Sequence, residues 1–199
     1  MTSFSSWGPT NDGRLKPEIS APGCEAGGEG YIKSTLPVDT YGGPGWCGTS
    51  MSAPAVSGTI ALMLEEFDSK GTYPLPSTIK AILVHTARDY GNTGPDYAFG
   101  YGIINAKKSI DLTKSDGANN NVIVEGEIPD QGRTDLYELE VPAGQSQLKI
   151  TLAWDDYQAT ANANPTLVNN LDLILIAPNG TEYSPWVLDP ANPGNAATT

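Results

Sequence analysis

The stretch Gly48-Thr49-Ser50-Met51-Ser52-Ala53-Pro54 stands where the character of the chain changes. Before it, residues 1–48 are rich in Gly, Pro and Ser, a composition typical of turns and loops. After it, apolar residues recur at helical spacing as far as Phe67, which predicts a helix over 50–67. That helix is apolar nearly all round, so we expect another layer, such as a sheet, to cover it.

Ser50 begins this predicted helix, and a serine at that position supports two interpretations. The commoner one is an N-cap, whose side chain accepts a hydrogen bond from the first N–H groups of the helix. The other is a nucleophile, because the free N–H groups and the positive dipole end of a helix stabilise an oxyanion. The tripeptide Gly-Thr-Ser by itself does not decide between them.

Short elements are predicted on both sides of this helix. Upstream, residues 19–23 fit a buried strand that ends at Pro-Gly, and residues 31–35 fit a second strand. Downstream, Ser77 is placed to cap a helix running to Arg88, and residues 103–110 fit a short helix. Residues 113–121 are almost entirely polar, so we interpret them as a linker.

Beyond this linker the apolar period changes to two. Apolar and polar residues alternate over 137–141 and 148–154, and residues 171–176 form a fuller apolar run. Turn sequences at 142–144 and 178–180 separate these segments. The pattern predicts an antiparallel β-sandwich.

Size and charge restrict the class of protein. A chain of 199 residues suits one domain or two small ones, and either could bury a sizeable core. The net charge of −12 argues against a nucleic-acid partner, because phosphate binding needs clustered Lys and Arg. No run of 18 apolar residues is present, and the sequence after Met1 does not resemble a signal peptide. We therefore expect no membrane span.

The two cysteines, Cys24 and Cys47, favour a disulfide. They form no CxxC motif and have no His nearby, so a zinc site is a poor explanation. A bridge would close a Gly-rich loop and would stabilise the fold by about 3 kcal/mol on the loop-entropy model. The alternative is a pair of buried free thiols.

Longer stretches of the sequence resemble a known family. Residues 4–23, followed by 48–58, look like the final part of the catalytic domain of subtilisin-like serine proteases, in the same order and spacing. The resemblance continues to about residue 112, through Ala81-Ile82-Leu83 and Phe99-Gly100-Tyr101-Gly102. Leu152-Ala153-Trp154-Asp155-Asp156, with residues 167–173 and 177–180, is similar to the jelly-roll domain that follows the catalytic domain in some bacterial alkaline subtilases.

This resemblance implies the fold class and the domain organisation. We expect part of a subtilisin-like α/β catalytic domain over 1–112 and the linker over 113–121. An all-β jelly-roll sandwich is expected over 122–199, and its loop-like end after residue 191 suggests that it is incomplete. A central sheet that is cut short would leave strand edges and apolar helix faces uncovered.

The resemblance also implies a reaction. Ser50 would attack a peptide carbonyl and form an acyl-enzyme, and its backbone N–H would supply half of the oxyanion hole. Protein or peptide would be the substrate, and the enzyme would be secreted. The Asp, the His and the oxyanion Asn of this family should lie upstream, but only 49 residues precede Ser50 and none is a His. We therefore expect the chain by itself to be inactive.

His85, the only histidine, lies in the predicted second helix, where the family pattern has no catalytic residue, so we expect a half-buried structural role.

Two alternatives for the function stay open. The chain could be a non-catalytic, calcium-stabilised binding or structural module. Alternatively, it could be half of an enzyme that is completed in trans, by a second copy or by a separate N-terminal half.

Calcium is the one cofactor that the sequence suggests, as a structural ion in the acidic tail. The candidate ligands are Asp172, Asn170 and Asp156, with Asn169 and Asp155 beside them. Oxygen ligands on strand ends and loops can supply the six to eight donors that calcium takes, roughly. The alternative is that Asn169 and Asn170 cap a turn while Asp172 points outward.

Overall fold

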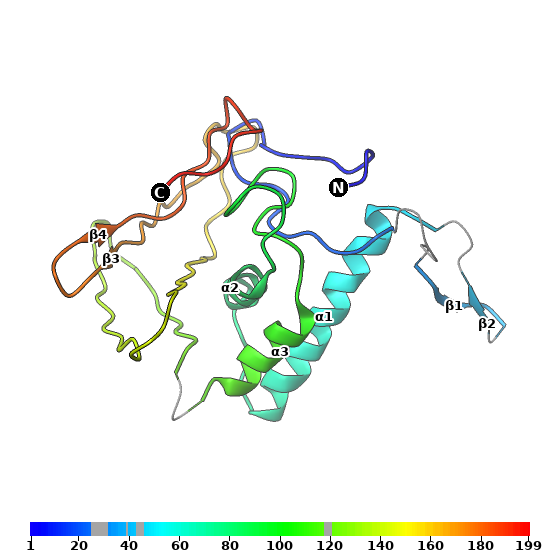
Figure 1. The fold of residues 1–199 in the computed structure, drawn as a ribbon, viewed down its shortest axis with the longest axis horizontal. Helices are drawn as coiled ribbons and strands as arrows, with labels where there is room; N and C mark the ends of the chain where they lie inside the picture. Colours follow the sequence, from blue (N-terminus) through cyan, green and yellow to red (C-terminus); the bar gives the residue numbers. More distant parts are fainter. Residues whose placement is uncertain (25–31, 39, 43–45, 118–120) are drawn as a thin grey trace.

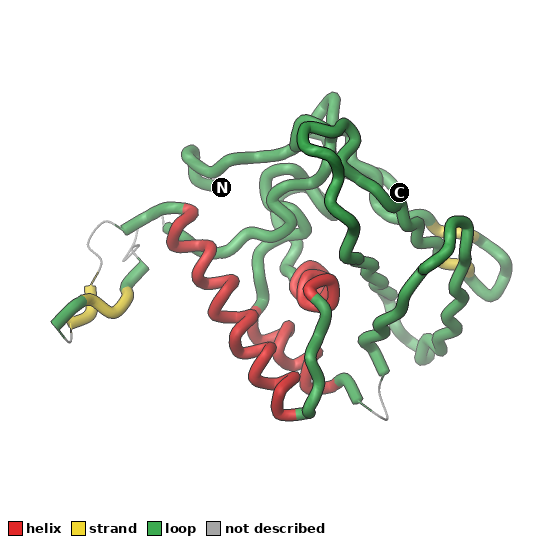
Figure 2. The backbone as a smooth tube through the Cα atoms, turned by 180° about the vertical axis from the view of Figure 1, so that it is seen from behind, coloured by secondary structure: helices red, strands yellow, loops and turns green. Residues whose placement is uncertain are grey.

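The computed structural model describes residues 1–24, 32–38, 40–42, 46–117 and 121–199. Its helices are α1 (Thr49–Ser69), α2 (Pro76–Thr86) and α3 (Ala106–Ser115). Its strands form two antiparallel pairs, β1 (Ser34–Leu36) with β2 (Thr40–Gly42) and β3 (Leu175–Ile176) with β4 (Glu182–Tyr183). The β1–β2 hairpin projects beyond the N-terminal end of α1, and residues 121–199, the tail, lie on the far side of α2 (Figures 1 and 2).

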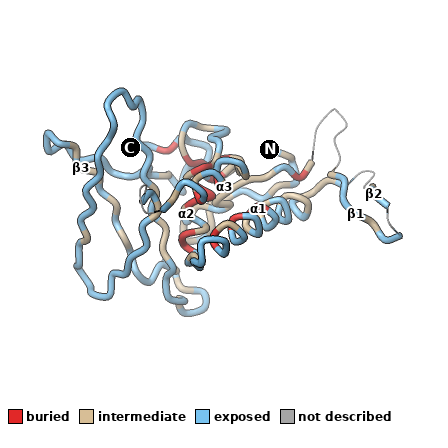
Figure 3. Tube along the Cα trace, turned by 90° about the horizontal axis from the view of Figure 1, so that it is seen from below, coloured by how far each residue is buried: buried red, intermediate tan, exposed pale blue. Residues whose placement is uncertain are grey.

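The hydrophobic core lies where the three helices meet. Met63 and Phe67 of α1 pack with Ile82 and Leu83 of α2, and these four side chains are buried. Figure 3 shows most of the buried positions gathered in this helical part, whereas the tail is largely exposed. No helix in the described part of the chain is long and apolar enough to span a membrane.

The helix predicted over 50–67 is confirmed as α1, but its expected cover is not found in the described residues. The buried positions Thr59, Met63 and Phe67 repeat every four residues and so form a single stripe. Leu62 and Leu64, which lie off that stripe, are 51% and 45% exposed. Val56 and Ile60 beside this stripe are partly buried against the core, whereas the described residues supply no sheet over the remaining faces of α1.

The second helix is confirmed with a correction to its N-terminus. Helix α2 begins at Pro76 with Leu75 as its N-cap, so Ser77 is inside the first turn and is not the cap. Its hydroxyl instead donates a hydrogen bond of 2.8 Å to Asp155 of the tail. The sequence predicts that Ser77 caps α2, whereas in the structure Ser77 is itself bonded by the Asp155 carboxylate of the tail.

The third helix corrects the proposed linker. Helix α3 starts at Ala106 after Asn105, whose side chain accepts from the Lys108 N–H at 3.0 Å, and it continues through Ser115. Residues 113–115, predicted as linker, are therefore helical. Thr113 is fully buried, and its hydroxyl donates to the Ser109 carbonyl at 3.0 Å. Polar residues can thus end a helix when their hydroxyls bond the preceding turn.

The short strand expected at 19–23 is reduced to a bridge. Ser20 pairs in parallel with Ile103, and Ile103 pairs antiparallel with Arg88. The second upstream strand is present as β1, three residues shifted from the predicted start, and Tyr31 lies outside the described residues.

The jelly-roll sandwich is not found in the described residues of the tail. The alternating segments 137–141 and 148–154 form no strand ladder, and the tail contains only β3, β4 and a bridge between Val187 and Thr198. Alternation specifies the two faces of a strand but not the backbone that pairs with it. The turn at 178–180 is confirmed, because the Gly180 N–H bonds the Ala177 carbonyl at 2.8 Å.

Candidate active site

Ser50 is the second residue of α1 and is exposed to solvent. Gly48 is the N-cap, and its carbonyl accepts from the N–H groups of Met51 and Ser52 at 2.9 and 3.4 Å. The N–H groups of Thr49 and Ser50, the first two of α1, have no backbone acceptor among the described residues, so they present donors at the positive dipole end of the helix. Ser50 itself is not the N-cap, so the commoner of the two interpretations of this serine is wrong for the described structure.

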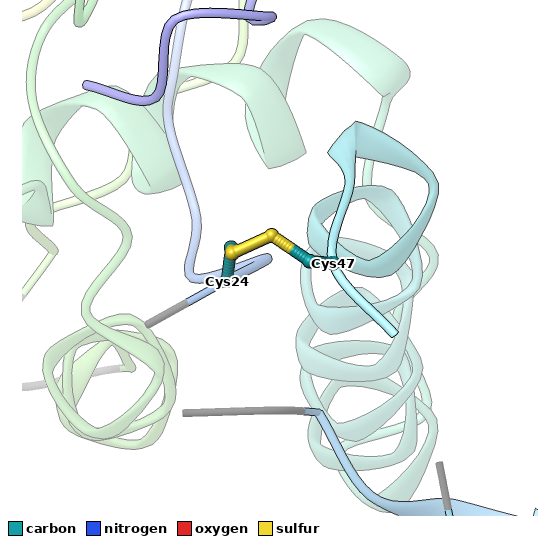
Figure 4. The surroundings of a disulfide bond; sticks show 2 residues. All are labelled: Cys24 and Cys47. Atoms are coloured by element: carbon teal, nitrogen blue, oxygen red, sulfur yellow. A yellow bond between two sulfur atoms is a disulfide. The ribbon is translucent and has the colours of Figure 1, made fainter. Parts of the chain in front are cut away.

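The segment that leads into Ser50 is tied to the N-terminal part of the chain. The predicted disulfide is present between Cys24 and Cys47, directly beside the start of α1 (Figure 4). Next to it, the Gly48 N–H donates to the Gly23 carbonyl at 2.9 Å. Two adjacent links therefore hold residues 23–24 against 47–48.

His85 lies in a different part of the molecule. Its Nδ1 is 3.0 Å from the Thr151 hydroxyl, and its ring is half-buried. Burial lowers the pKa of His85, and the neighbouring Lys149 lowers it further. His85 lines a cavity of about 340 Å³ with residues that do not include Ser50. This is the structural environment that the sequence predicts for it.

The predicted calcium ligands are engaged in three separate ways. Asp155 accepts from the Ser77 hydroxyl of α2 at 2.8 Å. Asp156 accepts from the backbone N–H groups of Tyr157, Val168 and Asn169 at 2.9, 2.8 and 3.1 Å. Burial acts to raise the pKa of Asp156, but these donors outweigh it and hold the pKa below its ordinary value.

Asp172 has a separate neighbour, since its Oδ1 accepts from the Asn170 side chain at 3.4 Å. Within the described residues, no group of three or more His, Cys, Asp or Glu side chains is arranged to hold a metal. Calcium takes about six to eight oxygens, so the ligands that the sequence suggested do not fit calcium in this arrangement.

Charged side chains of the tail hold both ends of α2, a role that the sequence did not reveal. At the N-terminus, Glu125 accepts from the Leu75 N–H at 3.1 Å and from the Thr78 hydroxyl, while Asp155 accepts from the Ser77 N–H at 3.2 Å. At the C-terminus, Lys149 Nζ donates to the Val84 and His85 carbonyls at 3.2 and 2.7 Å. Both signs match the helix dipole.

Asp12 makes a further link between the N-terminal region and the tail. It accepts hydrogen bonds from the hydroxyls of Thr10 and Thr166, from the Thr166 N–H at 3.1 Å, and from Arg14 Nε at 2.8 Å. These donors, Thr10 first, hold the pKa of Asp12 well below its usual range. Asn11-Asp12-Gly13 reads as a turn in the sequence, and no local signal indicates the partner 154 residues away.

These tail contacts border a cavity of about 620 Å³ between α2, residues 14–18 and the tail. Its lining mixes aromatic, apolar and charged groups, including Arg14, Lys80, Tyr101, Trp154 and Tyr157. Ser50 is not among its lining residues, so this cavity is separate from the candidate nucleophile.

Comparison with known proteins agrees with the resemblance seen in the sequence. Residues 1–102, which include Ser50 and all of α1 and α2, match the model of the Subtilase family. The chain belongs to the subtilase family. The members of this family are subtilisin-like serine proteases, and Ser50 lies within the matched residues.

Similar curated proteins support that assignment. The chain is 36% identical to Pyrolysin of Pyrococcus furiosus over 56% of its length, and 35% identical to Bacillopeptidase F of Bacillus subtilis over 64%. It is 30% identical to the Serine protease/ABC transporter B family protein tagA of Dictyostelium discoideum over 87%, so that similarity extends into the tail. The chain spans only 8%, 8% and 11% of these three proteins, respectively.

Proposed function

We propose that this chain supplies the nucleophile of a subtilisin-type serine endopeptidase, with Ser50 forming the acyl-enzyme. The observation that carries the proposal is the exposed position of Ser50 in the first turn of α1, inside the part of the chain that matches the family. The Ser50 hydroxyl oxygen would attack the peptide carbonyl, and the resulting oxyanion would lie near the Ser50 N–H at the positive dipole end of α1.

The general base is the missing part. No hydrogen bond joins the Ser50 side chain to any described residue, and His85 is bonded to Thr151 instead. We infer that the catalytic Asp, the His and the oxyanion Asn come from outside these 199 residues. They would stand upstream in a longer protein, or would be supplied in trans by a second copy or by a separate N-terminal half.

A chimera tests this function. The upstream part of a subtilase catalytic domain, with its Asp, His and Asn, is joined to residue 1, and hydrolysis of a protein substrate is measured. We expect activity that Ser50→Ala reduces by at least about 10⁴-fold, the order seen when a triad member is removed. Ser57→Ala is the matched control, because Ser57 is also an exposed serine of α1 and should leave activity unchanged.

Two outcomes would reject the proposal. One is a soluble, folded chimera without activity. The other is activity that survives Ser50→Ala.

We also propose that the enzyme acts outside the cell. The support is the Cys24–Cys47 disulfide, because disulfides persist in oxidising compartments. Finding the mature protein in the cytosol with both thiols reduced would contradict this placement.

For the tail we propose a jelly-roll domain over 122–199, distinct from the catalytic part over 1–112 and stabilised by calcium. The alternating pattern at 137–141 and 148–154 supports the sandwich, and its acidity supports the ion. Because the described ligands do not form a site, binding would require Asp172 and Asn170 to gain further oxygens. We expect added calcium to raise the melting temperature and Asp172→Asn to abolish that shift. A melting curve that is the same with EDTA and with calcium would reject calcium binding.

A further inference from the structure

Gly48 connects two parts of the candidate active site. Its N–H donates to the Gly23 carbonyl at 2.9 Å, and its own carbonyl accepts from Met51 and Ser52 to close the first turn of α1. Ser50 lies within that turn. Any shift of Gly48 relative to Gly23 therefore moves the backbone that carries the serine.

Gly23 packs against this turn without space for a side chain. It is buried, and a Cβ atom at this position would lie 2.0 Å from the Ser52 Oγ and 2.5 Å from the Gly48 carbonyl oxygen. This close approach needs glycine at residue 23. It also means that the backbone of residue 23 limits how far the first turn of α1 can move.

The Cys24–Cys47 bridge lies directly beside this contact. Each cysteine is the sequence neighbour of one of the two glycines, so the disulfide and the backbone hydrogen bond both join residues 23–24 to residues 47–48. Figure 4 shows the disulfide at this place. Both cysteines are partly exposed, so a reductant can reach them. Without the bridge, residue 23 would be linked to this turn by the Gly48–Gly23 backbone hydrogen bond and by the packing of Gly23 against Gly48 and Ser52.

We propose that the Cys24–Cys47 disulfide positions Ser50, and that its reduction loosens the first turn of α1 and lowers the reactivity of the serine. The proposed loosening of this turn rests on the geometry alone, whereas its effect on acylation of Ser50 also rests on the proposed function. The cysteines are positioning residues, because neither touches the reacting atoms.

The redox step is a thiol–disulfide exchange with a dithiol reductant. One reductant thiolate attacks a cysteine sulfur and forms a mixed disulfide, which releases the other cysteine as a thiolate. The second reductant thiolate then releases the remaining cysteine and closes a cyclic disulfide. Two electrons and two protons pass from the dithiol to Cys24 and Cys47, and reoxidation reverses the step.

Hydrogen–deuterium exchange of the 199-residue chain tests the proposal, with and without dithiothreitol. We expect reduction to speed exchange at the amides of Gly48, Met51 and Ser52 by about tenfold or more. The first turn of α3, closed by Asn105 and unconnected to the bridge, serves as the matched control and should not change.

A variant without the bridge completes the test. Cys24→Ser with Cys47→Ser should show the fast exchange without reductant and should not respond to it. Equal exchange in the oxidised and reduced chains would overturn the proposal. So would an equal increase at α1 and α3, because the bridge would then stabilise the whole fold and not this turn.

The catalytic consequence is measured in the chimera with a fluorophosphonate probe. We expect dithiothreitol to slow labelling of Ser50, and the double serine variant to label slowly in both conditions. If the chimera does not label at all, the proposed function fails, while the exchange measurement still decides whether the bridge orders the turn.

Discussion

Asp12 shows how a single carboxylate can join regions that are far apart in the sequence. Its hydrogen bonds reach Thr10 and Arg14 in its own turn and Thr166 in the tail. Its side chain is only 6% exposed, so these donors replace the water that an ionised carboxylate would otherwise bind. The ionised form is therefore favoured in the folded state, which agrees with the lowered pKa of Asp12.

This lowered pKa predicts how stability depends on pH. Asp12 in the unfolded chain protonates at about pH 4, whereas Asp12 in the folded chain stays ionised below that pH. The stability that it contributes is thus fully present above about pH 4 and is lost as the pH falls toward the folded pKa. Asp12→Asn should be less stable than the original chain at pH 7, and the difference should shrink by about pH 3.

Urea unfolding at the two pH values measures this difference. Asp130→Asn, at an exposed turn of the tail, is the control and should change little at either pH. A constant difference between Asp12→Asn and the original chain from pH 7 to pH 3 would contradict the argument.

At the scale of elements, α2 depends on partners outside itself. It has eleven residues and no cap from its own N-cap side chain. A helix this short is marginal without tertiary support. Glu125 and Asp155 at its first turn and Lys149 at its last turn provide that support. These contacts predict that the tail helps to keep α2 folded.

Replacing Lys149 tests this role. Lys149→Met keeps most of the side-chain length but removes the cation from the C-terminal carbonyls of α2. Because Lys149 is exposed and solvent screens its charge, we expect a modest loss of about 0.5–1 kcal/mol in the free energy of unfolding. Amide exchange should also increase in the last turn of α2.

Lys107→Met is the matched control, because Lys107 forms an exposed ion pair with Asp111 on α3 and, within the described residues, donates no hydrogen bond to α2. It should cost less than Lys149→Met and should leave α2 exchange unchanged. Equal effects of the two variants on α2 would mean that the tail does not hold this helix.

Across the whole molecule, sequence reasoning succeeded where the signal is local. The apolar repeat from Met51 to Phe67 predicts α1 because each turn of a helix is specified by residues three or four apart. The cysteine pair predicts the bridge because it forms no CxxC motif and has no His nearby. The prediction that Ser77 caps α2 was wrong, because Asp155, 78 residues away, accepts the hydrogen bonds of Ser77.

The strands of the tail were harder to predict, because their pairing depends on segments that are distant in the sequence. Period-two alternation predicts which residues share a face, but a ladder needs a second backbone whose position is set by distant segments. In the candidate site, Ser50 is recognisable from the residues adjacent to it. No such local pattern marks a general base, because the only histidine, His85, is bonded to Thr151.

Without any added segment, the chain should react only slowly at Ser50. A missing general base costs about 10²–10⁴-fold, and a missing oxyanion donor costs about 10²–10³-fold, a magnitude that comes from a subtilisin. We therefore expect a fluorophosphonate to label the chain at least about 10³-fold more slowly than the active chimera. His85→Gln should not change that rate, because His85 is committed to Thr151. Mass spectrometry after incubation measures the labelled fraction. Stoichiometric labelling that Ser50→Ala abolishes would show that these 199 residues activate the serine without a partner.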